Sequence, residues 1–321
     1  MTIMENKLRD LKIIVVGTIF LDIKGYADGD FKTASRNIGR IEYVHGGVGR
    51  NVAEDLAALG CRPVFISMSE DNPFGRDIVK RLNDAGVNTD YIMNVPEGIG
   101  TWMAIFNNDN DVYASISKRQ DLRPLISVLE EKGDEIFSGC QGLMLEMDVD
   151  ENLVRKVFEL AEKYRVDVYG VISNMDIAKQ RLEYIRKTRC FICNRYEAGI
   201  LFDCHFPADD PAAVLKTLKE QMRRLSISCM IVTLDKDGSV YAVNRSSFEP
   251  DDINKKTSGL CPAEKVEIAD STGAGDAFFT GTCAGLISGS DIMTACQLGT
   301  RMASEVISTT ENVYRTSETA L

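Results

Sequence analysis

A stretch near the carboxyl end of the chain combines glycines, small residues and an aspartate in an order that suits anion chemistry. Residues 270–282 read DSTGAGDAFFTGT. Gly273 and Gly275 permit a tight turn and close approach of a ligand, and the helix expected to follow directs its free N–H groups and positive dipole end at that turn. Asp276 would lie beside the bound anion, where a carboxylate can take a proton from a nucleophilic hydroxyl. The local alternative is that Asp276 only caps the helix; we expect it to do both.

A second glycine-rich stretch lies near residue 50. The segment HGGVGRNVAEDLAALG (45–60) places Gly46 and Gly47 before a helix, with Asn51 in its first turn. A side-chain amide both donates to and accepts from a hydroxyl, and paired glycines let a polyol lie against the backbone. Taken alone, the segment is more simply a glycine-rich turn into a helix. It lacks the Gly-Lys-Ser/Thr of a nucleotide P-loop, and no Gly-x-Gly-x-x-Gly fingerprint follows the first expected strand.

A third candidate, NRYE, directly follows a short apolar stretch. Asn194 and Glu197 are three residues apart at a helix start and so share one helix face. There they would orient water around Mg²⁺, an ion that keeps several of its waters. A capping box explains the same pair more simply, because Asn followed by Glu three residues later satisfies the first backbone N–H groups.

These segments must be positioned by a chain that alternates strands and helices. Apolar runs rich in β-branched residues alternate with segments of helical periodicity. Such alternation predicts an α/β protein with a parallel sheet and helices on both of its faces. The expected strands are 11–17, 63–67, 142–146, 166–172, 189–193 and 229–234, and the expected helices are 51–60, 73–86, 151–164, 176–187 and 210–224.

Two segments interrupt this alternation. Residues 22–45 and 99–117 read as short strands joined by turns, and the second is typical of a β-hairpin around the polar turn NNDND. Antiparallel strands inserted in a parallel α/β chain would form a flap over the carboxyl-terminal edge of the sheet, where ligands usually bind; surface decoration is the alternative. The polar stretch 246–259 is expected to be a loop. We expect residues 1–321 to form one domain.

The composition argues against several functional classes. The chain has 37 basic and 48 acidic side chains, a formal net charge of −11 and a sequence pI near 4.9. This balance argues against nucleic acid or an anionic membrane as the main partner, although a nest of backbone N–H groups can still bind a phosphate. The sequence shows neither a membrane span nor a signal peptide. Nine cysteines without a secretion signal indicate reduced thiols, and we expect a cytoplasmic protein.

Two rival chemistries fit the sequence poorly. The pair Cys190 and Cys193, with a Cys-His pair at 204–205, lacks the spacing of a structural zinc site. On a strand these two cysteines would face opposite sides of the sheet, so buried free thiols are the simpler interpretation. A serine catalytic triad would need a Gly-x-Ser-x-Gly elbow, which is missing, and His45 and His205 are the only histidines.

Together, the three motifs resemble the PfkB (ribokinase-like) family of sugar and nucleoside kinases. GGVGRN matches the family's N-terminal glycine motif, NRYE its Asn-x-x-Glu motif, and DSTGAGD its Asp-x-x-Gly-Ala-Gly-Asp signature. They occur in the family's order and approximate spacing over nearly the whole chain. The resemblance implies a ribokinase-like three-layer αβα sandwich with a mostly parallel sheet and a small β lid. It also implies an ATP-dependent enzyme that phosphorylates an alcohol group of a small sugar or nucleoside.

The resemblance assigns roles to the first two motifs. Asp276 is similar to the family's catalytic base, which deprotonates the acceptor hydroxyl. The backbone N–H groups of Gly273, Ala274, Gly275 and Asp276 are similar to its anion hole, which fits a reaction that depends on positioning and charge stabilisation. The residues that match the acceptor contacts of the family are Asp22, Gly46, Gly47 and Asn51.

The resemblance also implies metal sites. Asn194 and Glu197 match residues that organise Mg²⁺ and phosphate through water. Asp270 and Thr272 lie where many members bind a monovalent cation such as K⁺. The implied cofactors are therefore ATP and Mg²⁺, with K⁺ at the second site.

Two segments depart from the family, and the first, VYGVISN (168–174), lacks the Asp-Pro that often ends the middle strand. Many members read Thr-x-Gly-x-x-Gly on the strand that reaches ATP, whereas this chain has TLDKDG, with Asp235 in the place of the first glycine. A catalytically weak, ligand-binding homologue is an alternative that this loop motivates. The ATP contacts that the resemblance implies are Asn194, Thr233, Gly238, Gly273 and Gly275.

The acceptor is suggested by the glycine motif and by the hairpin. GGVGRN followed by an Ala-x-x-Leu-Ala-x-Leu-Gly helix looks most like the pseudouridine kinases of the family. We therefore expect a nucleoside such as pseudouridine, phosphorylated at its 5′ hydroxyl, with ribose, fructose or a related sugar as the alternative. Trp102 would stack on a base or pack within the hairpin. The open strand edges of the lid would suit a homodimer.

Overall fold

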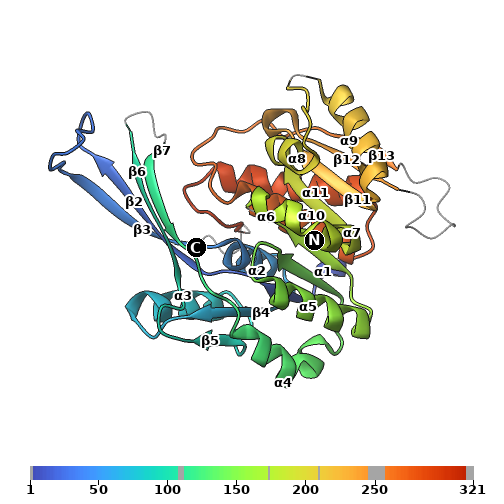
Figure 1. Cartoon of the computed structure of the whole chain (residues 1–321), viewed down its shortest axis with the longest axis horizontal. Helices are drawn as coiled ribbons and strands as arrows, with labels where there is room; N and C mark the ends of the chain where they lie inside the picture. The colour runs from blue at the N-terminus through green and yellow to red at the C-terminus, as the bar shows by residue number, and fades with distance from the viewer. Residues whose placement is uncertain (1–2, 108–111, 173, 209, 245–256, 316–321) are drawn as a thin grey trace.

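The computed structural model describes residues 3–107, 112–172, 174–208, 210–244 and 257–315. Their strands lie in two sheets, one of nine strands and one of four. Figure 1 shows helices on both sides of the large sheet, with the small sheet extending away from it. No helix in these ranges is long and apolar enough to cross a membrane.

The nine-stranded sheet is built from the short apolar segments that the sequence pattern predicted as strands, with shorter strands at its edges. β-branched and aliphatic residues dominate these segments because their side chains pack well on a pleated surface. The strands are β1 (Lys12–Val16), β4 (Arg62–Ser69), β5 (Ile92–Asn94), β8 (Gly142–Glu146), β9 (Val168–Val171), β10 (Cys190–Asn194), β11 (Cys229–Thr233), β12 (Ser239–Val243) and β13 (Ser258–Cys261).

The strand order in this sheet is β13-β12-β11-β10-β9-β8-β1-β4-β5. All neighbours from β11 to β5 are parallel, and β12 and β13 are antiparallel additions at one edge. In β1, Ile13 and Val15 face one hydrophobic cluster, whereas Ile14 and Val16 face another. Both faces of the sheet are therefore apolar and need a covering layer. The predicted mostly parallel α/β sheet is confirmed.

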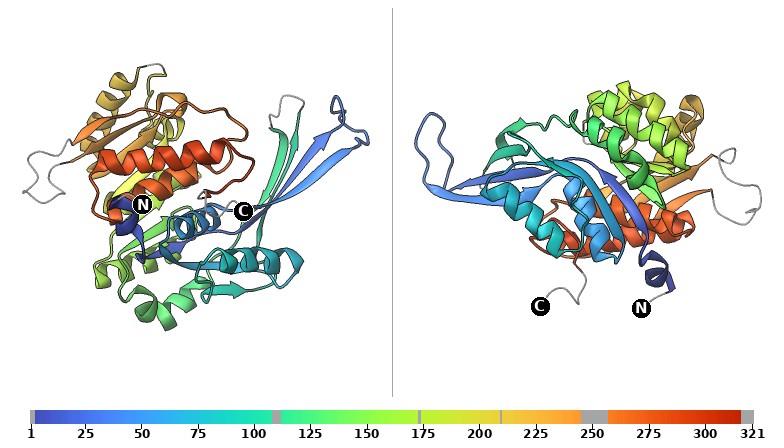
Figure 2. Two further views of the ribbon diagram at one scale, coloured as in Figure 1. Left: turned by 180° about the vertical axis from the view of Figure 1, so that it is seen from behind. Right: turned by 90° about the horizontal axis from the view of Figure 1, so that it is seen from below.

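Helices form that covering layer on both faces, which gives the three-layer arrangement seen in the two views of Figure 2. Buried residues of one set of helices join each hydrophobic cluster. On one face lie α4 (Leu125–Phe137), α5 (Glu151–Tyr164), α6 (Met175–Gln180), α7 (Leu182–Lys187), α8 (Arg195–Phe202) and α9 (Pro211–Leu225). On the other lie α1 (Ile3–Leu8), α2 (Val48–Ala58), α3 (Pro73–Asp84), α10 (Ala274–Ile287) and α11 (Ile292–Ile307).

Two local predictions are corrected. The helix expected at 176–187 is broken into α6 and α7 at Arg181, whose buried side chain reaches out of the helix to Glu151 at 2.8 Å. A tertiary ion pair thus overrides helical periodicity. The loop expected at 246–259 lies mostly outside the described residues, and its end, from Ser258 onward, belongs to β13.

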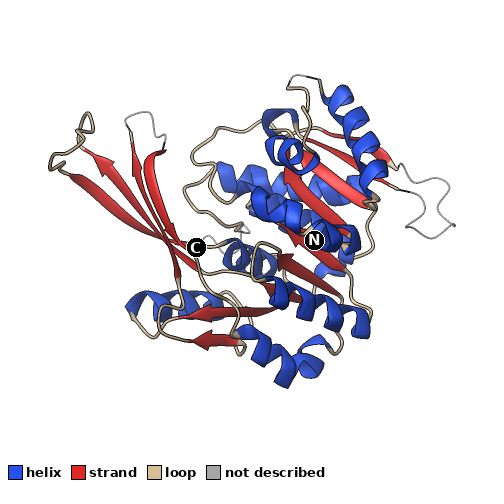
Figure 3. Cartoon of the chain, viewed as in Figure 1, coloured by secondary structure: helices blue, strands red, loops and turns tan. Residues whose placement is uncertain are grey.

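The four-stranded sheet is formed by the two segments that interrupt the alternation. Its strands pair in the order β3-β2-β6-β7, with an antiparallel pair at each edge and a parallel pair in the centre. In Figure 3 these strands extend well beyond the large sheet. The turn of the expected hairpin, residues 108–111, lies outside the described part of the chain. The strands are β2 (Phe20–Ala27), β3 (Gly39–Gly46), β6 (Gly100–Phe106) and β7 (Val112–Lys118). We call this sheet the lid.

Candidate active site

The first and last motifs, far apart in sequence, converge on one cavity of about 460 Å³ bounded by both sheets. It lies at the carboxyl ends of the parallel strands, where α/β proteins usually bind ligands. The expected site residues on its wall are Asp22, Gly46, Gly47, Asn51, Thr272, Gly273 and Asp276. The other wall residues are Thr18, Phe20, Val48, Trp102, Ser117, Arg119, Gln120, Glu146, Asp148, Val149 and Asn312.

Asp276 lies in the first turn of α10 with its carboxylate turned toward the cavity. Its Oδ2 accepts a hydrogen bond from Nδ2 of Asn51 at 2.6 Å. The N-cap residue of α10 is Gly273, and no side chain caps this helix. The expectation that Asp276 caps the helix is therefore wrong. It sits inside the first turn, and the amide of α2 holds its carboxylate away from the helix backbone.

Two carboxyl groups of the cavity have pKa values well above the ordinary value of a carboxyl group. Burial, aided by the charge of Asp22, raises the pKa of Asp276 to about 6, against the lowering effects of Asn51 and Arg50. Burial also raises the pKa of Asp22 to about 6, although Lys24 and Arg50 act in the opposite direction. A carboxylate with a pKa near 6 is ionised at neutral pH, yet it is basic enough to accept a proton during a reaction.

The start of α10 leaves backbone N–H groups without an acceptor among the described residues. Gly273 has φ 83°, and a Cβ there would lie 2.1 Å from the backbone oxygen of Asn312, so only glycine fits. The N–H of Ala277 donates a helical hydrogen bond to the oxygen of Gly273 at 2.9 Å. The N–H groups of Gly275 and Asp276 come earlier in the first turn, where a helix offers no acceptor of its own. A Cβ at Gly275 would find no described atom within 4 Å. This geometry suits a phosphoryl group.

Ala274 contributes less to this anion site than its neighbours. Its N–H bonds the backbone oxygen of Ser271 at 3.3 Å, which closes the turn before the helix. Gly275 and Asp276 are therefore the N–H donors best placed to receive an anion.

The cavity wall beside Asp276 also carries groups that suit a hydroxylated ligand. Asn51 is 5% exposed, and its Oδ1 has no hydrogen-bond partner among the described residues. A buried amide oxygen of this kind favours a donor supplied by a ligand. A Cβ at Gly46 would lie 2.5 Å from Oδ2 of Asp22, and one at Gly47 would lie 2.5 Å from the oxygen of Thr18. Backbone packing therefore requires glycine at Gly47, whereas a side chain at Gly46 would have to displace the carboxyl group of Asp22.

Two acidic residues at the end of β8 join the site without a sequence motif. Oε2 of Glu146 accepts hydrogen bonds from the N–H groups of Thr18 at 2.8 Å and Gly49 at 3.3 Å, and from the Thr18 hydroxyl. Burial and the charge of Asp148 raise the pKa of Glu146 to about 8. The available signal was their position at the carboxyl end of a buried strand, where sheet-edge sites form.

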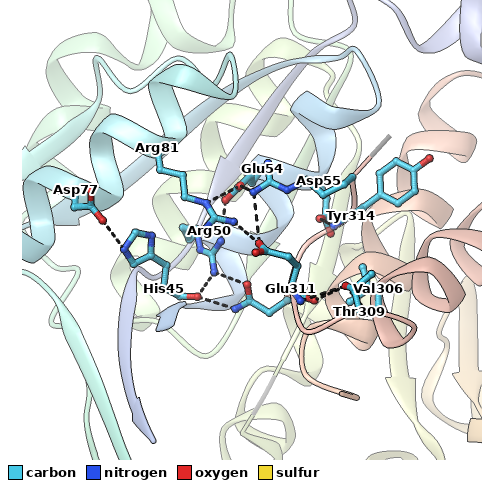
Figure 4. A network of polar contacts seen from close by, with 12 residues as sticks. His45, Arg50, Glu54, Asp55, Asp77, Arg81, Val306, Thr309, Glu311 and Tyr314 are labelled. Carbon is cyan, nitrogen blue, oxygen red and sulfur yellow. Dashed lines mark hydrogen bonds and ion pairs between the residues drawn. The ribbon is translucent and has the colours of Figure 1, made fainter. Parts of the chain in front are cut away.

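A buried ionic network lies behind the glycine-rich turns (Figure 4). Arg50, 0% exposed, pairs with Glu54 at 2.8 Å and donates to the backbone oxygen of His45 and to Oδ1 of Asn312. Burial alone would raise the pKa of Glu54, but Arg50 and Arg81 lower it below its usual value. Removing one partner would leave a buried charge unpaired. The network therefore holds the first glycine-rich turn against the carboxyl-terminal segment.

Of the residues expected to contact ATP, Gly273 lines this cavity, whereas Asn194 and Thr233, at the ends of β10 and β11, lie outside its lining, as do Gly238 and Gly275. Asn194 and Thr233 are neighbours in the register of these strands. Asn194 and Glu197 form a complete capping box, with bonds of 2.9 and 2.7 Å. The capping box expected as the simpler alternative is therefore present, and it uses one oxygen of Glu197. The second carboxyl oxygen could still accept from a metal-bound water, so the pair remains compatible with Mg²⁺ held through water.

The altered loop after β11 keeps a tight turn. Asp235 has φ 52°, a left-handed conformation that aspartate tolerates better than most residues. Gly238 has φ 89°, and a Cβ there would lie 2.1 Å from the oxygen of Cys261. The N–H of Leu234 bonds the oxygen of Gly238 at 2.7 Å and closes the turn. Asp235 therefore stands in the place of the usual glycine with the backbone conformation that glycine favours.

Asp270 is already paired with a cation from the chain. Its Oδ1 accepts hydrogen bonds from the N–H and the hydroxyl of Thr272 at 2.8 and 2.7 Å, and its Oδ2 lies 3.6 Å from Nζ of Lys24. Burial would raise the pKa of Asp270, but Thr272 and Lys24 lower it below its usual value. A second cation at this carboxylate would be repelled by the ammonium. These residues therefore do not fit the monovalent cation implied by the resemblance.

The nine cysteines are free, and Cys190 and Cys193 face opposite sides of their strand, as expected. Among the described residues, no group of three or more His, Cys, Asp or Glu side chains could hold a metal ion directly.

Comparison with known proteins places this site in a family. Residues 10–319 match the family described as pfkB family carbohydrate kinase. The chain is 30% identical to the guanosine-inosine kinase of Exiguobacterium acetylicum over 94% of this chain and 96% of that protein. It is 22% identical to the pseudouridine kinase of Escherichia coli over 84% and 82% of the two chains.

Solved structures confirm the ribokinase-like fold. A structure of Arabidopsis thaliana ribokinase, complexed with ribose and ATP, aligns with 94% of each chain at a TM-score of 0.79 and 17% identity. A ribokinase structure from Giardia lamblia aligns over the same shares at a TM-score of 0.77 and 15% identity. With its motifs gathered on this fold, the chain belongs to the PfkB family of carbohydrate kinases and is a phosphotransferase that acts on an alcohol group of a small molecule.

Proposed function

We propose that this kinase transfers the γ-phosphoryl group of ATP to the 5′ hydroxyl of a nucleoside. The observation that carries the proposal is the carboxylate of Asp276, which faces the cavity 2.6 Å from Asn51, beside the open N–H groups of α10. Asp22 and Asn51, which line the same cavity, would hold the ribose hydroxyls. A nucleoside kinase needs this combination of a base, an anion site and a polyol site in one enclosed space.

The proposed reaction uses these groups in one displacement. Asp276 accepts the proton of the 5′ hydroxyl while the oxygen of that hydroxyl forms a bond to the γ-phosphorus. The bond from that phosphorus to the bridging oxygen of ATP breaks, and ADP leaves with the electron pair. The N–H groups of Gly275 and Asp276 donate to the transferring phosphoryl oxygens. Asn194 and Glu197 would hold Mg²⁺ through water, and the ion would supply neutralising charge on the phosphates.

The inner face of the lid supports a nucleoside over a free sugar. Asp22 is the neighbour of Trp102, and Trp102 of Ser117, in the register of the lid strands, so the three side chains share one face. All three line the cavity. Trp102 also meets Phe106 edge to face, at 6.2 Å between ring centroids. The lid therefore presents an aromatic surface on which a base can stack and which excludes water when a ligand is bound.

Arg119 favours a 6-oxopurine as that base. It lines the cavity just after β7 and makes no hydrogen bond or ion pair with the described residues. A guanidinium fork can donate to both O6 and N7 of guanine or hypoxanthine, whereas adenine places an amino donor there and a uracil base offers O4 alone. Guanosine and inosine are therefore the first acceptors proposed. Pseudouridine, favoured by the glycine motif, is the second.

An acceptor panel tests this proposal. ADP release is measured with guanosine, inosine, adenosine, pseudouridine, uridine, ribose and fructose. We expect the highest kcat/KM with guanosine and inosine, and Arg119→Ala should reduce their advantage over adenosine by roughly tenfold or more. Arg123→Ala, which removes a nearby arginine outside the cavity lining, is the matched control. Equal turnover of free ribose and the nucleosides, or an equal loss on every acceptor in Arg119→Ala, would contradict the proposal.

We also propose that the outer face of the lid joins two copies of the chain. Tyr43, Met103 and Ile116 align through Ile23 across the sheet, on the face opposite Trp102. Their side chains are 57%, 48% and 72% exposed, which is unusual for an apolar row. Light scattering should give the mass of a dimer for the wild type and of a monomer for Ile116→Glu. A wild-type monomer at assay concentrations would contradict the proposal.

A further inference from the structure

Lys24 is a buried lysine on the inner face of the lid. It follows Asp22 by two residues on β2, so both side chains lie on the same side of the strand. The side chain of Lys24 is only 7% exposed. Lysine is rarely buried to this extent without a paired charge, because desolvation of an ammonium is costly. Its partner is Asp270, whose Oδ2 lies 3.6 Å from Nζ.

Asp270 opens the loop that leads into the anion site. Thr272 occupies Oδ1 with two hydrogen bonds, so Lys24 faces the oxygen that remains. Gly273, three residues after Asp270, holds the left-handed turn before α10. The ammonium thus neutralises a carboxylate that would otherwise repel a phosphoryl group arriving at the same loop.

We infer that Lys24 supplies, from within the chain, the positive charge that the family resemblance assigns to a monovalent cation at Asp270 and Thr272, so that this kinase needs no K⁺. The same ion pair joins the strand that carries Asp22 to the loop that carries the anion site. Lys24 is therefore a positioning residue that couples the lid to the start of α10. The inference rests on the proposed function only for its turnover assay, and its binding assay needs no acceptor.

The test compares salts and variants. The ATP-dependent rise in melting temperature and the rate of ADP release are measured in KCl and in tetramethylammonium chloride at equal ionic strength. The wild type should give the same values in both salts within about twofold, because its site is already charged. Lys24→Met in tetramethylammonium should lose roughly tenfold or more in ATP affinity and turnover, and K⁺ should restore part of both by filling the space left at Asp270.

Two variants guard this test. Lys24→Arg keeps the charge and should stay independent of K⁺. Lys118→Met removes an exposed lid lysine whose nearest acidic partner, Glu97, lies 3.9 Å away, and it should behave as the wild type. A wild type whose ATP binding needs K⁺, or a Lys24→Met variant equal to the wild type in both salts, would overturn the inference. If Lys24→Met fails to fold, the comparison of the wild type in KCl and in tetramethylammonium chloride still tests the inference. A failed acceptor panel with intact, K⁺-independent ATP binding would count against the proposed acceptor alone.

Discussion

The helices α2 and α10 both begin at glycine-rich turns beside the same cavity. They differ in whether the protein supplies hydrogen-bond partners for their first N–H groups. At the start of α2, the N–H of Gly49 and that of nearby Thr18 are bonded to Glu146, and a Cβ at Gly49 would lie 2.7 Å from the backbone of Gly17. At the start of α10, a Cβ at Gly275 would meet no described atom within 4 Å. The first helix end is filled by the protein, and the second is open.

This difference explains why similar motifs serve different purposes. Any helix N-terminus attracts an anion through its free N–H groups and its dipole. Packing supplies α2 with the carboxyl group of Glu146 from β8, whose oxygen accepts from the N–H of Gly49, so this end becomes a fixed wall that carries Asn51. Among the described residues no such carboxyl group is bonded to the N–H of Gly275, so the proposed phosphoryl site lies at the start of α10. Glycine content alone does not distinguish the two; the presence of Glu146 does.

The largest effect is expected from the open end. Asp276→Asn should lower kcat by about 10²- to 10⁴-fold, because the amide cannot accept the proton of the attacking hydroxyl. ATP affinity, measured by calorimetry, should change little. Asp134→Asn, which alters a surface carboxylate paired with Lys163, is the control. Turnover of Asp276→Asn within tenfold of the wild type would break the assignment of α10 as the reactive end.

A matched pair of glycine substitutions sharpens the comparison. Gly275→Ala should keep or raise the melting temperature, because alanine favours a helix by about 1 kcal/mol, yet lower kcat by roughly tenfold, because its methyl group enters the phosphoryl space. Gly49→Ala should destabilise the fold by roughly 2 kcal/mol through overpacking against Gly17. Thermal unfolding and turnover of both variants provide the measurement. The same changes in melting temperature and turnover in both variants would show that the two helix ends do not differ.

The smallest effect concerns Glu146 at the start of α2 and the pH dependence of stability that this residue causes. The pKa of Glu146 is about 8 in the folded protein against an ordinary value of 4.5. The unfolded chain therefore loses this proton first, and Glu146 lowers stability progressively as pH rises from about 4.5 to 8. Glu146→Gln lacks this titration, so its stability should rise by about 2 kcal/mol relative to the wild type between pH values of about 6 and 8. Urea unfolding of both proteins at both pH values tests this prediction. It would be contradicted if the free energy of unfolding changed equally with pH in the wild type and in Glu146→Gln.

What the sequence could predict follows from how local each feature is. The glycine-rich turns are contiguous motifs, and the period of the apolar residues predicted the strands and helices that carry them. Glu146 and Asn312 could not be predicted from local patterns, because their contacts with Thr18 and His45 span 128 and 267 residues. The orientation of Asp276 also depends on a distant residue, so a helix-cap rule that considers only near neighbours gave the wrong partner.

The pH dependence of kcat/KM tests most directly whether Asp276 is the base. In the wild type, kcat/KM should rise with pH through about 6 and then level off, because the carboxylate must be ionised to accept the proton. Asp22 has a similar pKa, so Asp22→Asn should keep this rise at a reduced level, whereas Asp276→Asn should be slow and flat across the same range. A profile in Asp276→Asn that still rises through about pH 6 at near wild-type rates would contradict the account.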